Sequence, residues 1–168
     1  VHERAIDCFQ QFLPPVSLQE RRTALRRICR MFNAAGLTSV HDAYVTDLDL
    51  LTYQEGLAAG DLSLRVYALM IFPLFASLHA AGICTGLGNE HLRIGGIKLI
   101  TDGAISGRNA WLLQPYSGKS NDYGLRAIGP AELEAQVLQI HKAGFQVCTH
   151  ANGDAAIDMT LTAYEKAM

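Results

Sequence analysis

The sequence lacks several features that would assign it to common protein classes. It has no run of 18 or more apolar residues, so no membrane-spanning helix is predicted. Its four cysteines, at 8, 29, 84 and 148, show no C-x-x-C spacing, which argues against a disulfide scaffold or a cysteine zinc site. We therefore expect reduced thiols and a cytoplasmic location.

Charge of one sign is also missing. The formal net charge is −2, from 14 basic and 16 acidic residues, so the composition gives no indication of nucleic-acid binding. Arginines gather in residues 21–30, but apolar residues alternate with them at helical spacing. This pattern predicts the solvated face of an amphipathic helix rather than a polyanion site.

Helical and strand-like segments alternate along the chain, which predicts an α/β fold with a parallel sheet. An S-x-x-E capping box at Ser17 opens the first clear helix, and Asp154 is expected to cap the last one. The predicted strands are 38–42, 64–70, the segment around Lys98, and 146–150, and the predicted helices are 17–36, 47–59, 77–81, 130–143 and 154–168. No linker divides the chain, so residues 1–168 are read as one domain.

The segment GGIKLITDG, residues 95–103, places a lysine inside an apolar strand. Lysine is almost never fully buried without a partner. At the period of a strand, Lys98, Ile100 and Asp102 share one face, close to the carboxyl end where parallel sheets carry their active sites. A purely structural Lys98–Asp102 ion pair is the alternative.

The segment QVCTHANGD, residues 146–154, has the same design. His150 ends this strand on the same face as Cys148, and histidine at a strand end is a common metal ligand or general base. Cys148 could be a zinc ligand or a nucleophile, although a small core residue is the stronger interpretation.

Three segments match the motifs of a known family: GLTSVHDA at 36–43, GIKLITDGAISGRNAWLLQPYSG at 96–118 and THANGDAAID at 149–158. With them, the sequence resembles the YtcJ-like branch of the amidohydrolase superfamily. The resemblance implies a metal-dependent (β/α)8-barrel, or TIM-barrel, hydrolase that cleaves amide-type C–N bonds with a metal-activated water. It implies that Lys98 matches a lysine that is often carboxylated to bridge two metals. It also implies that His150 matches a histidine ligand, with zinc as the expected metal.

Other residues that this superfamily uses are missing. The six histidines show no H-x-H pair, and neither the histidine of strand six nor the aspartate of strand eight, which acts as acid and base, has a match, so the catalytic residue is unknown. We expect a fragment, a partial TIM barrel containing about strands two to five. We also expect no stoichiometric metal in this chain alone and no carboxylation of Lys98.

A long polar segment, residues 104–129, follows the Lys98 strand and is expected to lie over the mouth of the barrel. Arg108, Trp111 and Tyr116 are its candidate substrate contacts, although Trp111 could simply pin the loop. His41, Asp42, Asp102 and Asp154 are assigned to substrate contact or to support of the metal ligands. Only one of His41 and Asp42 can face inward.

Two function classes stay open. The first is a metal-dependent hydrolase that acts on a small molecule. The second is a catalytically silent half-barrel that associates as a homodimer, because open strand edges and inward apolar side chains of strands 64–70 and 97–100 would need cover.

Overall fold

The computed structural model describes residues 12–168, which form one four-stranded parallel sheet. The strand order follows the sequence, so each strand pairs with the next one along the chain. This order confirms the predicted α/β fold with a parallel sheet. The strands are β1 Ser39–Val45, β2 Arg65–Ile71, β3 Leu92–Ile100 and β4 Val147–His150.

The helices begin and end close to the predicted positions. They are α2 Leu18–Ala34, α3 Asp47–Ala58, α4 Phe75–Ala80, α5 Pro130–Lys142 and α6 Asp154–Ala167, with short 3-10 turns at Phe72–Leu74 and Ile105–Gly107. The predicted capping box is present, because the Ser17 side chain accepts from the Glu20 backbone N–H and the Glu20 side chain accepts from the Ser17 N–H. The cap predicted at Asp154 is wrong by one residue: Gly153 is the N-cap and Asp154 is the first helical residue.

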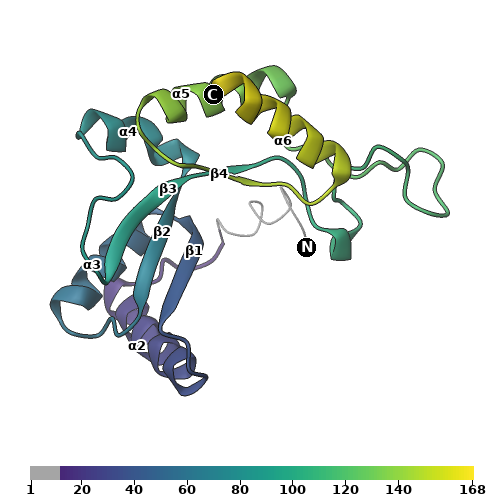
Figure 1. The fold of residues 1–168 in the computed structure, drawn as a ribbon. Coiled ribbons are helices and arrows are strands. Elements are labelled where there is room, and N and C mark those ends of the chain that lie inside the picture. Colours follow the sequence, from purple (N-terminus) through teal and green to yellow (C-terminus); the bar gives the residue numbers. More distant parts are fainter. Residues whose placement is uncertain (1–11) are drawn as a thin grey trace.

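The core lies between the sheet and its helices. Met70 of β2 and Ile97 and Leu99 of β3 are buried in one cluster with Leu133 and Val137 of α5. Figure 1 shows α5 and α6 side by side along β4, and α2 and α3 beside the other end of the sheet. The opposite side of the sheet carries Tyr67, Lys98, Ile100, Cys148 and His150, and we call it the inner face.

The inner face differs from the expectation in one respect. Apolar side chains of β2 and β3 were expected to point inward. Leu69, Ile71 and Ile100 do so, whereas Met70, Ile97 and Leu99 face the helices. The inner face is therefore mixed, since these apolar side chains lie there with Lys98 and His150, and Ile100 is exposed. The register shift at Ala68/Leu69 lies at the glycine pair and adds one residue, Gly95, to β3 relative to β2.

That glycine pair allows close packing on the inner face. A Cβ on Gly95 would overlap the ring of Tyr67, and a Cβ on Gly96 would lie 3.1 Å from Sγ of Cys148. The Tyr67 hydroxyl donates to the carbonyl oxygen of Gly95 at 3.0 Å and lies 2.9 Å from Oε1 of Gln146. Glycine is therefore required at position 95, because the ring of Tyr67 lies directly against the backbone there.

The arginines of α2 bind carboxylates of α3 and of the turn after it. Arg21 pairs with Asp49 at 2.9 Å, and Asp61 accepts from Arg22 at 2.9 Å and lies 3.5 Å from Arg26. The cluster thus holds two helices together and is more than a solvated face.

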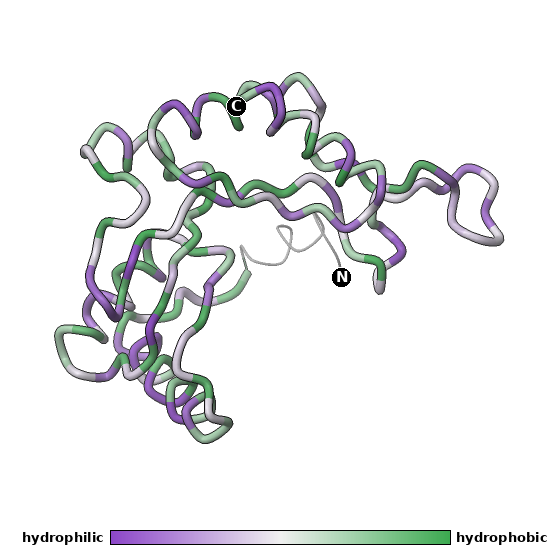
Figure 2. Tube along the Cα trace, viewed as in Figure 1, coloured by the Kyte–Doolittle hydropathy of each residue, from purple (hydrophilic) through white to green (hydrophobic). Residues whose placement is uncertain are grey.

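Residues 104–129 leave the carboxyl end of β3, and we call them the mouth loop. They return to it through a bridge between Asp102 and Arg126, and Ala127 donates its backbone N–H to Thr101. The loop projects beyond the sheet at the right of Figure 1, and Figure 2 shows that its tip is mostly hydrophilic. Among residues 12–168, no helix combines the length and the apolar character needed to cross a membrane.

Candidate functional site

Lys98 lies on the inner face, two residues before β3 ends. It pairs in register with Ile71 of β2 and with Cys148 of β4. The side chain is half-buried, and burial lowers the pKa of its amine, an effect that the nearby Cys148 opposes. A lowered pKa increases the fraction of neutral amine, which is the nucleophilic form.

His150 lies at the end of β4, in register with Ile100. Lys98 and His150 therefore share the inner face of adjacent parallel strands, with His150 two residues nearer to the carboxyl edge. The ring atom Nε2 lies 3.0 Å from the carbonyl oxygen of Gly103 and 3.6 Å from Oδ1 of Asp102. The structure thus brings together three of the predicted site residues, Lys98, His150 and Asp102, at one end of the sheet.

Asp102 is not the partner of Lys98. Its buried carboxylate accepts backbone N–H groups of Trp111, Asn152 and Gly153 at 3.0, 2.9 and 2.7 Å. The alternative of a structural Lys98–Asp102 ion pair is therefore wrong, and Lys98 forms no ion pair with any residue in the described part of the chain. Asp102 instead joins the end of β3 to the mouth loop and to the start of α6.

Asn152 is a site residue that the sequence reasoning did not single out. Its Nδ2 donates to the Gly103 carbonyl oxygen at 3.0 Å and lies 3.3 Å from Nε2 of His150. The spacing H-x-N in THANGD was the available signal, since an asparagine two residues after a strand-end histidine can fold back over it.

Cys148 sits between these residues on the inner face. Burial raises the pKa of its thiol, and Lys98 opposes that effect. A raised pKa keeps the sulfur protonated, whereas a nucleophile needs the thiolate. Its sulfur also packs close to the backbone of Gly96, which agrees with its interpretation as a small packing residue.

His41 and Asp42 lie on opposite faces of β1. The His41 ring lies 4.9 Å from the ring of Tyr67, on the inner face. Asp42 lies toward the helices, where its Oδ2 accepts from the hydroxyl of Tyr53 at 2.6 Å. Burial and the Asp42 carboxylate raise the pKa of Tyr53, so this hydroxyl stays a donor. Asp42 does not reach the face of Lys98.

Two candidates in the mouth loop contact each other. The exposed Arg108 guanidinium lies 5.4 Å from the centroid of the Tyr116 ring and donates to the carbonyl oxygen of Ser117 at 2.8 Å. These contacts are within the loop, and the role of Arg108 and Tyr116 in substrate binding stays a prediction.

Trp111 and Asp154 lie where the mouth loop meets α6. Trp111 packs against the core, with the Arg126 guanidinium 5.5 Å from the centroid of its ring. Oδ1 of Asp154 accepts the backbone N–H of Leu113 at 2.8 Å and that of Ala155 at 2.9 Å. Trp111 thus fixes the loop to the core and Asp154 fixes it to the start of α6, and direct contact with a substrate stays a prediction for both.

The described residues do not make up a metal site by themselves. No group of three or more His, Cys, Asp or Glu side chains in residues 12–168 is placed to hold a metal ion. Lys98 and His150 are two possible ligands, whereas a catalytic zinc site usually has about three protein ligands and an open position.

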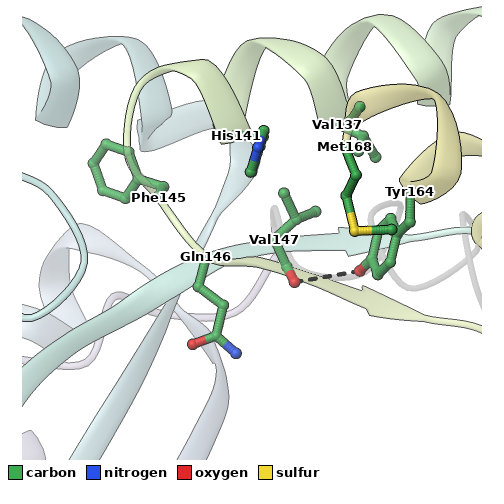
Figure 3. Close-up of a pocket in the computed structure, with 8 residues that line it drawn as sticks. Val137, His141, Phe145, Gln146, Val147, Tyr164 and Met168 are labelled. Carbon is green, nitrogen blue, oxygen red and sulfur yellow. Dashed lines mark hydrogen bonds between the residues drawn. The ribbon is translucent and has the colours of Figure 1, made fainter.

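A hollow of about 240 Å³ lies away from these residues, between α5, α6 and the start of β4. Figure 3 shows its largely apolar lining, with the Tyr164 hydroxyl directed at the backbone of Val147 and Gln146 directed away. It is at the opposite end of β4 from His150, so it is not the candidate active site.

The fold and this edge define a class, the parallel α/β proteins whose polar side chains gather at the carboxyl ends of the strands. Residues 2–168 match the family model described as the amidohydrolase family, and the chain belongs to that family. The predicted resemblance to its YtcJ-like branch is confirmed.

Two curated proteins are similar over nearly the whole chain. The protein LONG AFTER FAR-RED 3 of Arabidopsis thaliana is 28% identical over 97% of this chain. YtcJ of Bacillus subtilis (strain 168), an amidohydrolase by its name, is 26% identical over 98% of this chain. The chain spans only 30% and 31% of these two relatives.

Two crystal structures of uncharacterized metal-dependent hydrolases have the same fold. The one from Pyrococcus furiosus has a TM-score of 0.89 at 25% identity and covers 99% of this chain and 36% of its own. The one from Pyrococcus horikoshii OT3 has a TM-score of 0.82 at 28% identity and covers 89% of this chain and 31% of its own.

Proposed function

We propose that this chain forms the Lys98–His150 part of the active site of a metal-dependent amidohydrolase, which cleaves amide-type C–N bonds of a small molecule. The observation that carries the proposal is the placement of Lys98 and His150 on the inner face of adjacent parallel strands, beside their carboxyl ends. In this proposal β1 to β4 correspond to strands two to five of a TIM barrel, and the chain is a fragment of it.

Zinc is the proposed metal because imidazole is one of its usual ligands. Such a metal would supply an activated water and polarise the substrate carbonyl. Lys98 would take part as a carbamate, and burial favours the neutral amine that reacts with carbon dioxide. Further ligands must come from a longer chain, since the described residues offer only two.

The proposal can be tested in a chimera in which residues 1–168 replace the matching segment of the Pyrococcus furiosus hydrolase. The readouts are metal content by elemental analysis and metal-dependent hydrolysis of a panel of amides. We expect Lys98→Met and His150→Gln to lower metal affinity by roughly 10- to 100-fold or more. Metal content that is unchanged in both variants would contradict the proposal.

Matched controls are available in the same chain. Lys119→Met changes a lysine in the mouth loop whose side chain is 63% exposed, and His91→Gln changes a histidine before β3 whose side chain is 43% exposed. Neither residue lies beside Lys98 and His150, so both variants should keep the metal and the activity.

For the isolated chain we propose self-association as a homodimer without catalysis. In the described residues β1 and β4 each have one edge without a partner strand. Ile157 and Leu161 of α6 and Met168 directly after it are exposed apolar residues. Unpaired edges and apolar patches favour association.

A further inference from the structure

The carboxylate of Asp102 connects three separate segments. Its side chain is 0% exposed and accepts N–H groups from Trp111 in the mouth loop and from Asn152 and Gly153 in the turn between β4 and α6. An ionised carboxylate accepts strong hydrogen bonds from N–H donors. Asp102 therefore fixes both segments that flank the ring of His150 relative to the end of β3.

The surroundings of His150 favour one tautomer. Nε2 faces two acceptors, the Gly103 carbonyl oxygen at 3.0 Å and Oδ1 of Asp102 at 3.6 Å. A protonated Nε2 donates to the Gly103 carbonyl oxygen and lies near the negative Asp102 carboxylate, whereas a bare Nε2 would place its lone pair against both. Nδ2 of Asn152 donates one hydrogen to the same carbonyl at 3.0 Å, and its contact with Nε2 is longer, at 3.3 Å, so the shorter contact of Nε2 is the one with the carbonyl.

We propose that Asp102 is a positioning residue for His150, which holds the imidazole as its Nε2–H tautomer and leaves Nδ1 as the ring atom with a free lone pair. A hydrogen bond from one ring nitrogen to a carboxylate or carbonyl is the usual way in which proteins orient a ligating histidine. The inference rests on the proposed function only for the use of Nδ1 as the ligand atom. The tautomer itself is a property of this chain.

Packing beside Asp102 keeps the two segments from sliding. A Cβ on Gly153 would overlap the carbonyl oxygen of Trp111, so the turn and the loop touch backbone to backbone. Asp154 adds a second link one residue later through the N–H of Leu113. The carboxylate of Asp102 is therefore held in a fixed position relative to the turn and the loop.

The test is a ¹H–¹⁵N spectrum of the imidazole nitrogens in the full ¹⁵N-labelled chain without metal, with His150 assigned from the spectrum of His150→Gln. We expect His150 to be held as the Nε2–H form above the pH at which its ring is protonated. A Nδ1–H form, or the tautomer mixture of an unrestrained ring, would overturn the proposal. This measurement needs no folded variant at Asp102.

Asp102→Asn then separates positioning from a structural role. The amide keeps the size of the side chain but removes the charge and one acceptor, so we expect a mixture of tautomers. If His150 keeps its tautomer while the Trp111 and Gly153 amides lose about tenfold or more in exchange protection, Asp102 is only structural and the proposal fails. Asp122→Asn is the matched control, because Asp122 lies in the mouth loop but accepts a hydrogen bond from the Gly124 N–H. This variant should leave the His150 signal unchanged.

The outcome is independent of the chimera experiment. A fixed Nε2–H tautomer with no metal binding in the chimera would refute the proposed function alone. A free tautomer with full metal binding would refute the positioning role alone.

Discussion

Lys98 and His150 lie on the same face of two adjacent parallel strands, with Cys148 as the register partner of the lysine. Side chains in this relation are close because parallel strands align their residues without the alternation of antiparallel pairs. The pair thus depends on the register between β3 and β4, and the bulge that precedes Lys98 sets which face the lysine occupies.

Lys98→Met should leave the isolated chain as stable as the wild type, or more stable, at about pH 7. Burial lowers the pKa of Lys98 in the folded state, so its charged form costs stability there. Between that lowered pKa and the unfolded value the unfolded chain binds more protons, and the stability of the wild type rises with pH. The advantage of Lys98→Met should therefore shrink toward about pH 10.

Urea unfolding of both proteins at the two pH values measures this difference, and the shared background titrations cancel in the comparison. An advantage that grows with pH would show that the amine is stabilised by a partner.

Gly95→Ala should destabilise the chain by about 1–3 kcal/mol, because the new methyl group would overlap the ring of Tyr67. The cost should be smaller in a Tyr67→Ala background, which removes the ring. A double-mutant cycle by urea denaturation measures the coupling between the two residues. Equal costs in both backgrounds would mean that the ring is not what requires glycine.

Some features of the structure could be predicted from the sequence, and others could not. The four strands, the capping box at Ser17 and the shared face of Lys98 and His150 follow from local patterns of period two and from capping chemistry. The role of Asp102 could not be predicted, because its donors at Trp111 and Gly153 come from segments whose approach depends on tertiary packing.

The faces of β3 illustrate the same limit. Strict alternation places Ile100 with Lys98, as found, but the bulge at Gly95 and Gly96 could not be located without the partner strand. Register is a property of two strands, whereas the sequence pattern describes one.

Asp61→Asn should lower the stability of the chain by about 1–2 kcal/mol, because Asp61 is the common acceptor for Arg22 and Arg26. The Asp61 side chain is only 14% exposed, so solvent screens these pairs less than a surface pair. Thermal unfolding monitored by circular dichroism measures the loss. Asp158→Asn, an exposed position on α6, is the control, and an equal loss in both would contradict the linking role of Asp61.

The isolated chain should form a homodimer whose contact includes α6 and the open edge of β4. Ile157 and Leu161 lie four residues apart on one side of α6, and Met168, the residue after the helix, follows seven residues later; their exposed fractions are 42, 61 and 94%. A twofold contact covers these residues in both copies at once, whereas a head-to-tail contact would continue into fibres. Light scattering should give twice the 18.3 kDa of the chain at micromolar concentration.

Leu161→Glu tests the surface itself, because a charge among these apolar residues should shift the chain toward the monomer. Leu113→Glu is the matched control, since this residue is 60% exposed but lies in the mouth loop. We expect only the α6 variant to weaken association. A wild-type mass of 18.3 kDa would refute the dimer, and equal effects of both variants would move the contact away from α6.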